Sequence, residues 1–152
     1  MIQLKDIQIL SQLRKNSRKS LTQLSRETKV PVSTLYDKLK GYRGKIIKKF
    51  TALLDFKVFD FDTRATIVIK VDHMGKEALR KHLERHSRVN SLYRINNGFD
   101  FMVEGLFCNV KELEDFLDEL ETTYDVIATK VYHMIDDIKR EAFLENLLEV
   151  KK

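Results

Sequence analysis

Several residue types that mark particular protein classes are scarce in this sequence of 152 residues. Its single cysteine, Cys108, excludes an intramolecular disulfide framework and is too few for a cysteine-based metal site. One proline, five glycines and no tryptophan predict mostly regular structure with short loops. No apolar run approaches the roughly 18 residues needed to cross a membrane, and residues 1–20 lack a signal-peptide core. We therefore predict an intracellular, soluble protein with no membrane partner.

The charge is divided unevenly along the chain. Residues 1–50 contain 13 Lys and Arg against 3 Asp and Glu, a balance of +10, although the whole chain carries only +5. Residues 51–152 contain 15 basic and 20 acidic residues, a balance of −5. A basic half joined to an acidic half is typical of a protein in which one part binds a polyanion and the other does not.

The first thirty residues carry the pattern of two short helices. Asp6 suits the first turn of a helix whose apolar residues, Ile9 and Leu13, recur at helical spacing. Ser20 and Gln23 then have the spacing of a capping box, in which each side chain bonds the backbone amide of the other residue. This box predicts the start of a second helix at Ser20.

Pro31 separates the second helix from a third. It has no amide proton and biases Val30 away from helical angles, but it is tolerated in the first turn of a new helix. That helix would bury Leu35, Leu39 and Tyr42, which are spaced i, i+4, i+7. Two helices joined by a short turn, with one helix before them, form the helix-turn-helix plan, whose last helix enters the major groove.

The helix-turn-helix plan predicts two groups of side chains that contact double-stranded DNA. Short hydroxyls at the start of the last helix can approach base edges, whereas basic side chains and a preceding helix N-terminus bind phosphates. Arg14 lies beside the second group and would add positive charge. The predicted contacts are Arg18, Lys19, Ser20, Thr22, Ser33, Thr34, Tyr36, Asp37, Lys38 and Lys40.

The remaining hundred residues alternate between strand and helix patterns. An Asn97-Gly98 pair predicts a hairpin turn, because both residues tolerate the positive φ that a tight hairpin requires. The expected order is strand Thr63–Asp72, helix Gly75–His86, strand Val89–Ile95, strand Phe99–Phe107, helix Val110–Thr122 and strand Asp125–Ile138. This βαββαβ order is the ferredoxin-like plan.

We therefore predict an α+β protein. Residues 1–45 would form a helix-turn-helix domain of winged-helix-like type, residues 46–62 a linking strand, and residues 63–152 a ferredoxin-like regulatory domain. Val68 and Met102 place apolar side chains on the sheet face that the helices leave open, so we expect a second copy to cover that face. A homodimer suits a DNA reader, because two half-sites multiply specificity.

The N-terminal pattern resembles the opening of the Lrp/AsnC family of bacterial and archaeal transcription factors, also called leucine-responsive or feast/famine regulators. The matching residues are Asp6, Ile9, Leu10, Leu13, Asn16, Ser17, Arg18, Ser20, Gln23, Leu24 and Ser25, with Thr51–Asp55 similar to the family's linking strand. The sequence departs from the family at Lys29, where a glycine is usual. That turn position often needs a positive φ, which costs a lysine about 1 kcal/mol.

Membership of this family would imply a regulatory domain that dimerises through its sheets, assembles further into tetramers or octamers, and binds an amino acid. The family's turn motif Gly-Asp-Tyr-Asp lies opposite Asn97-Gly98-Phe99-Asp100, and a ligand-contacting threonine corresponds to Thr129. The resemblance thus predicts an effector site at Asn97, Gly98, Asp100 and Thr129. It also implies an archaeal source, no cofactor, and a cytoplasmic, nucleoid-associated location.

Three other functions share features with this sequence. Residues 98–103 resemble the third strand of RNA-recognition domains, but most of that motif's positions differ here. An enzyme is not expected, because the chain lacks a phosphate-binding glycine loop and a nucleophile elbow. His82 and His86 are spaced i, i+4 as metal ligands can be, yet no third ligand is evident in the sequence, so no metal site is predicted. The alternative function that the basic half also predicts is that of a non-specific DNA-organising protein with no small-molecule effector.

Overall fold

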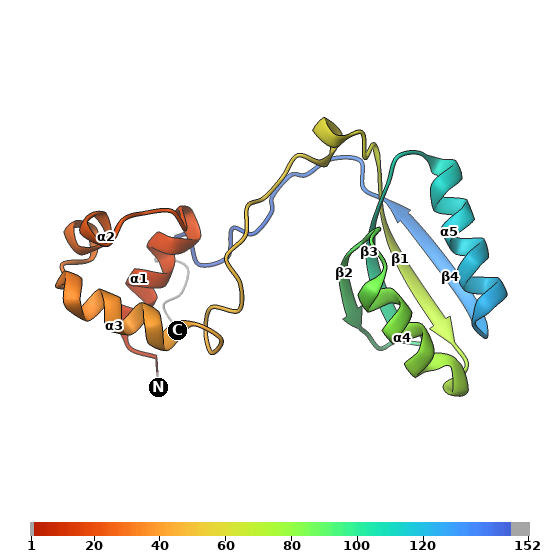
Figure 1. Cartoon of the computed structure of the whole chain (residues 1–152), viewed down its shortest axis with the longest axis horizontal. Coiled ribbons are helices and arrows are strands. Elements are labelled where there is room, and N and C mark those ends of the chain that lie inside the picture. Colours follow the sequence, from red (N-terminus) through yellow and green to blue (C-terminus); the bar gives the residue numbers. More distant parts are fainter. Residues whose placement is uncertain (1, 147–152) are drawn as a thin grey trace. The chain divides into compact units, whose positions relative to one another are not determined.

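The computed structural model of the chain describes residues 2–146, which divide into two units (Figure 1). Among the described residues, the helical unit contains residues 2–53 together with residues 138–146, and the sheet unit contains residues 54–137. We had expected everything after residue 62 to form one domain. Instead, the chain returns to the helical unit after the sheet unit is complete. Among residues 2–146, no helix is long and apolar enough to span a membrane.

The helical unit consists of three helices, as the sequence predicts. They are α1 (Leu4–Lys15), α2 (Leu21–Thr28) and α3 (Val32–Tyr42). Their core contains one fully buried side chain from each helix, namely Ile9, Leu24 and Leu35 at 0% exposure. Burying such aliphatic side chains stabilises a unit of this size by about 1.5–3 kcal/mol each.

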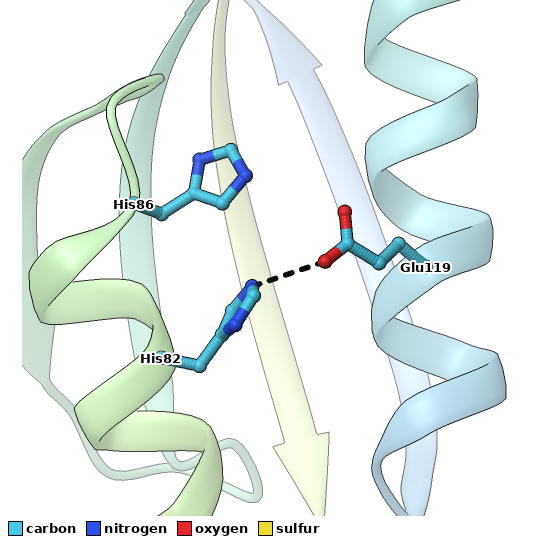
Figure 2. Close-up of side chains that lie close together, drawn as sticks. All are labelled: His82, His86 and Glu119. Atoms are coloured by element: carbon cyan, nitrogen blue, oxygen red, sulfur yellow. Dashed lines mark ion pairs between the residues drawn. The ribbon is translucent and has the colours of Figure 1, made fainter.

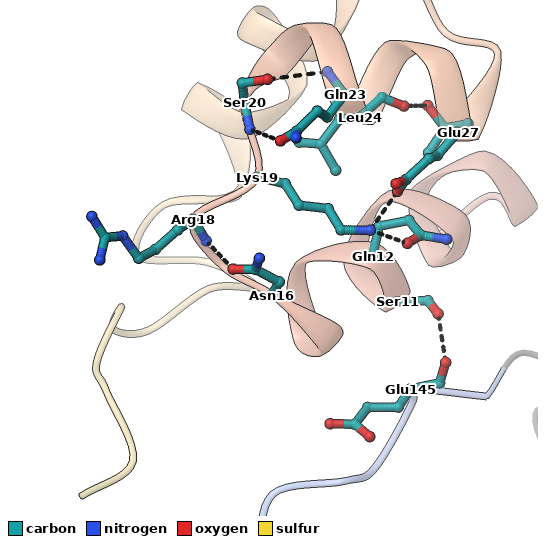
Figure 3. Close-up of polar contacts among 11 residues, drawn as sticks. Ser11, Gln12, Asn16, Arg18, Lys19, Ser20, Gln23, Leu24, Glu27 and Glu145 are labelled. Atoms are coloured by element: carbon teal, nitrogen blue, oxygen red, sulfur yellow. Dashed lines mark hydrogen bonds and ion pairs between the residues drawn. The ribbon is translucent and has the colours of Figure 1, made fainter.

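Local hydrogen bonds fix where α2 begins. The Ser20 hydroxyl accepts from the Gln23 amide at 3.2 Å, and Gln23 Oε1 accepts from the Ser20 amide at 3.0 Å (Figure 3). This is the predicted capping box. After α2, Lys29 has φ 56° and ψ 34°, the left-handed conformation, and Pro31 then caps the start of α3. The positive φ expected at Lys29 is therefore present.

Residues 46–62 differ from the prediction, because they form no strand within the described chain. The segment contains one short 3₁₀ helix, η1 (Phe56–Phe59), and the isolated bridge that joins Arg43 to Ile47. A strand requires a neighbour to satisfy its backbone amides and carbonyls. The sheet of the single chain offers none to residues 48–55, so the predicted linking strand is absent.

The sheet unit has the predicted ferredoxin-like order. Its elements are β1 (Thr63–Val71), η2 (His73–Gly75), α4 (Lys76–Arg85), β2 (Val89–Arg94), β3 (Phe101–Phe107), α5 (Val110–Thr123) and β4 (Val126–His133). The antiparallel sheet is ordered β2-β3-β1-β4, and α4 and α5 cover one face (Figure 1). On that covered face, His82 of α4 points toward Glu119 of α5 (Figure 2).

Two strand boundaries differ from those predicted by more than one residue. β4 was expected to continue to Ile138 but ends at His133, because its neighbour β1 begins at Thr63 and offers no further partner after the bond from the Met134 amide to the Arg64 carbonyl. β3 begins at Phe101 and not at Phe99. The predicted hairpin turn is confirmed, with φ 62° at Asn97 and 86° at Gly98.

The sheet face opposite the helices carries apolar side chains, as the alternation predicts. Val68, Met102 and Leu106 are half-buried there, and Tyr93 and Tyr132 on the flanking strands are more than half exposed. Phe101, by contrast, is 6% exposed and belongs to the core beneath the helices. Phe101, which the RNA-recognition motif would use for base stacking, is therefore not on the open face.

Candidate nucleic-acid interface and ligand cavity

One face of α3 carries side chains without polar partners in the described chain. Ser33, Thr34, Tyr36, Asp37 and Lys40 are exposed, and none of their side chains has a hydrogen-bond or ion-pair partner among residues 2–146. We call these five residues the α3 reading face. Their hydroxyl, carboxylate and ammonium groups are those that bond base edges and phosphates in a major groove.

The opposite side of α3 is held against α1 by a polar cluster. Asp6 Oδ1 accepts hydrogen bonds from Tyr42 Oη at 2.5 Å and from Lys38 Nζ at 2.6 Å, while Asp6 Oδ2 accepts from the Gln3 amide at 2.9 Å. The bonds from Lys38, Tyr42 and Gln3 lower the pKa of Asp6 from 3.8 to about 2. Burial, together with the bond to Asp6, raises the pKa of Tyr42.

This cluster changes the interpretation of Lys38. The sequence placed Lys38 on the outer face of α3, but its side chain is only 28% exposed and its ammonium is bonded to Asp6. A predicted phosphate contact is thus engaged within the unit. The sequence did not reveal the pair, because Asp6 lies 32 positions earlier and its helical pattern gives no indication of what its carboxylate meets.

The predicted phosphate contacts before α2 also separate into two kinds (Figure 3). Lys19 Nζ bonds Gln12 Oε1 at 2.7 Å and Glu27 Oε2 at 2.5 Å, so its charge is used inside the unit. Arg18 is exposed, and its guanidinium has no partner among the described residues. Ser20 and Thr22 are exposed at the N-terminus of α2, where backbone amides favour an anion.

Arg14, which we had expected to add charge near the DNA, bonds the end of the chain instead. Its Nε donates to the Phe143 carbonyl at 3.1 Å, and its guanidinium pairs with the Glu141 carboxylate at 3.1 Å. The buried Ser11 hydroxyl donates to the Glu145 carbonyl at 3.1 Å (Figure 3). The C-terminal segment, residues 138–146, is thereby attached to α1.

The sheet unit contains a cavity of about 250 Å³ at the hairpin end of β2 and β3. Its lining is rich in charge and consists of His73, Lys76, Glu77, Arg80, Arg94, Asp100 and Phe101. Two of the three cations are paired, Lys76 with Asp100 at 2.7 Å and Arg80 with Glu77 at 2.7 Å. Arg94 has no partner among the described residues and is exposed.

The predicted effector residues are brought to this cavity only in part. Asp100 lines it, but both carboxylate oxygens are engaged, one by Lys76 and the other by the Val71 amide at 3.0 Å. Although burial opposes the shift, these bonds lower the pKa of Asp100. Asn97 and Gly98 lie exposed in the adjoining turn, and Thr129 is on β4 opposite Ile69. Neither the turn pair nor Thr129 lines the cavity.

Sequence reasoning missed Arg94, the unpaired cation of the cavity. Its position was accessible in principle, because the hairpin turn sets the register that places Arg94 opposite Phe101. The sequence could not predict that α4 also lines the cavity, because Lys76 and Arg80 come near the hairpin only through the tertiary fold.

Residues 64–143 match the family described as the Lrp/AsnC ligand binding domain. This match covers more than half of the chain. The chain belongs to the Lrp/AsnC family. The resemblance seen in its N-terminal residues is therefore confirmed by the other half of the sequence.

Curated relatives and solved structures agree with this assignment. The chain is 28% identical over 134 residues to the HTH-type transcriptional regulator FL11 of Pyrococcus furiosus, covering 84% of this chain and 89% of that protein. It is 25% identical to an uncharacterized HTH-type transcriptional regulator of Pyrococcus horikoshii, covering 92% and 95%. Both relatives are HTH-type transcriptional regulators.

The fold of this Lrp/AsnC chain is shared with solved regulators. A Neisseria meningitidis transcriptional regulator, solved as a complex with L-Met, superposes with a TM-score of 0.84 at 19% identity and covers 92% of this chain and 94% of its own. LrpC of Bacillus subtilis superposes with a TM-score of 0.82 at 19% identity and covers 91% and 98%. At this identity the likeness establishes the α+β fold, in which three helices precede a ferredoxin-like sheet.

Proposed function

We propose that this Lrp/AsnC protein is a sequence-specific DNA-binding transcriptional regulator that acts as a dimer or higher oligomer on the nucleoid. The observation that carries the proposal is the α3 reading face, five exposed polar side chains without internal partners. The opposite side of the same helix is fixed by Asp6 and Tyr42. A rigid helix with one free polar face is what major-groove recognition requires.

The exposed polar side chains of the helical unit would contact different parts of the DNA. Ser33 and Thr34 lie at the start of α3, where short hydroxyls can approach base edges closely. Lys40 and Arg18, which are both exposed, supply charge for phosphates. In a dimer, two α3 helices would enter successive major grooves about 34 Å apart on a palindromic site.

Selection of bound sequences from a pool of random duplexes tests this proposal. A sequence-specific regulator enriches a palindromic site, which it binds roughly 10³-fold or more tightly than random duplex. The alternative, a DNA-organising protein without an operator, also binds with strong salt dependence but yields a flat sequence profile. A flat sequence profile at physiological salt would show that the protein organises DNA without recognising an operator.

We also propose that the cavity of the sheet unit binds an amino acid effector. Its volume of about 250 Å³ is below the roughly 300–1,000 Å³ of sites for drug-sized ligands, and so suits a small ligand. The unpaired Arg94 can hold a carboxylate, whereas the acidic lining residues Glu77 and Asp100 are already paired with Arg80 and Lys76. The L-Met bound by the Neisseria regulator of the same fold supports this ligand class.

Calorimetric titration with each of the common amino acids tests the cavity. Binding of one or a few of them is expected to weaken at least about tenfold in Arg94→Met, because the carboxylate loses a charge-assisted hydrogen bond. Arg85→Met, an exposed arginine of α4 outside the cavity, is the matched control and should bind normally. Equal losses of affinity in Arg94→Met and Arg85→Met would show that Arg94 does not bind the amino acid.

A further inference from the structure

Three potential metal-ligating side chains converge between the two helices of the sheet unit (Figure 2). His82 and His86 come from α4 and its C-cap, and Glu119 comes from the facing side of α5. One ligand atom from each lies within 4.8 Å of the other two. In the part of the chain that the structure describes, this is the one such group of three.

The His82 side chain presents a buried nitrogen that no hydrogen bond satisfies. Its Nε2 has essentially no solvent exposure and no bonding partner among the described residues. The nearest acidic oxygen, Glu119 Oε1, is 3.6 Å away, which is too far for a hydrogen bond. An unsatisfied buried nitrogen that faces a carboxylate across such a gap has the geometry of a ligand whose cation would lie between them.

We propose that His82, His86 and Glu119 form a binding site for a divalent first-row transition ion, with Zn²⁺ as the representative. Two imidazoles and one carboxylate are a donor set that zinc takes in proteins, with a fourth position left for water. Bonds of about 2.0–2.2 Å in a tetrahedron separate the ligand atoms by roughly 3.3–3.6 Å. The observed spread of up to 4.8 Å therefore has to contract on binding.

The surroundings allow that contraction. Glu119 is half exposed at 50%, so its side chain can move toward the two rings without disturbing the core. His86 Nδ1 accepts a hydrogen bond from the Arg88 amide at 3.2 Å. Coordination through Nε2 would move the ring proton to Nδ1 and displace this long contact. The ring of Tyr124 lies tilted against His82, and the ring of Phe116 meets His86 edge-on, with centroid distances of 5.3 and 4.9 Å.

A metal ion at this position would connect the two helices that cover the sheet. α4 and α5 are joined here by the 3.6 Å pair of His82 and Glu119, whose attraction is weak at that exposure. An ion that binds the folded unit and not the unfolded chain raises the free energy of unfolding by mass action. The site is remote in sequence from α3, so zinc binding can be measured without any reference to DNA.

The test is a titration of the untagged, EDTA-treated full-length chain with ZnCl₂, followed by calorimetry and thermal unfolding. We expect one saturable site per chain and a rise in melting temperature with zinc. Co²⁺ should give the visible absorption of a tetrahedral nitrogen–oxygen site. In Glu119→Gln and in His82→Gln, the affinity should fall at least about tenfold and the cobalt spectrum should disappear.

Matched controls remove the same residue types from elsewhere. The double variant His73→Gln, His133→Gln deletes the other two histidines, both exposed, and Glu121→Gln removes a neighbouring exposed carboxylate of α5. These variants should bind zinc as the unmodified chain does. Absence of saturable binding, or unchanged affinity in Glu119→Gln, would overturn the proposal. Because Glu119 is half exposed, that variant keeps its fold, which far-UV circular dichroism verifies.

Discussion

Lys29 occupies a backbone conformation that suits glycine. With φ 56° it lies in the left-handed region at the C-terminus of α2, where a side chain crowds the following carbonyl. We predict that Lys29→Gly raises the free energy of unfolding by up to about 1 kcal/mol. Urea denaturation followed by far-UV circular dichroism measures the change.

Arg26→Gly is the control for this substitution. Arg26 is exposed on the same helix but has an ordinary helical backbone, so glycine there should lower the free energy of unfolding by about 0.5–1 kcal/mol. Opposite signs at two neighbouring positions would locate the effect in the φ angle of Lys29. The same sign at both would show that the left-handed conformation costs nothing.

Asp6 makes the stability of the helical unit depend on pH. The pKa of Asp6 is about 2 in the folded chain and 3.8 where its carboxylate makes no contacts, as in the unfolded chain. As pH falls, Asp6 is therefore protonated first in the unfolded chain. The stability that Asp6 contributes is therefore complete above pH 4. We predict that it is lost progressively as pH falls from about 4 toward 2, as measured by urea denaturation at a series of pH values.

Other carboxylates titrate in the same range, so the contribution of Asp6 has to be isolated. Asp6→Asn keeps the side-chain size and removes the titration. The difference in stability between the two proteins should be largest above pH 4 and should narrow toward pH 2, because the protonated aspartic acid also loses its ion pair with Lys38. A difference that does not vary with pH would show that Asp6 titrates normally.

At the scale of the element, α3 presents side chains with separable roles. Ser33→Ala should chiefly change which bases are preferred, because its hydroxyl is exposed and free. Lys40→Ala should weaken binding to all duplexes and reduce the log–log salt slope by about one unit per copy, hence about two in a dimer. Binding assays on selected and random duplexes across a range of salt concentrations measure both effects.

Lys38→Met tests the opposite expectation for the neighbouring lysine. Since Lys38 bonds Asp6, its loss should lower the free energy of unfolding by about 1–3 kcal/mol and leave the salt slope unchanged. A reduced slope in Lys38→Met with normal stability would mean that the lysine leaves Asp6 to bind a phosphate when DNA is present.

The elements that could be predicted from sequence are those fixed by nearby residues. The α2 start at Ser20, the turn at Pro31 and the hairpin at Gly98 each depend on groups within a few positions. The features that could not be predicted depend on contacts between residues that are far apart in the sequence. Lys38 meets Asp6, Arg14 meets residues beyond 140, and the end of β4 is set by where β1 begins. The candidate sites divide in the same way, since Ser33 needed only the helix, whereas Glu119 came near His82 only through the fold.

At the scale of the whole molecule, the open apolar face of the sheet supports self-association. We predict that Met102→Lys, which places a charge in the centre of that face, shifts the protein from dimer or larger assembly to monomer. Multi-angle light scattering over a range of concentrations measures this. DNA binding should weaken in parallel, because two linked half-sites become one.

Met74→Lys is the matched control for the open face. Met74 is 85% exposed in η2, outside the sheet, so this substitution should leave the assembly unchanged. If the unmodified chain is itself a monomer at all concentrations, or if Met102→Lys assembles normally, the open face is not the contact.

The return of the chain to the helical unit has a consequence for handling the protein. Because residues 141–145 bond Ser11 and Arg14, the sheet unit is an insertion within the helical unit and not an appendage to it. A single protease nick in residues 46–53 cuts the covalent path between α3 and the sheet unit. The fragment that begins after such a nick still carries the C-terminal segment that bonds α1. Nicked protein can therefore remain associated in solution and migrate as intact on a sizing column, while a denaturing gel shows two pieces.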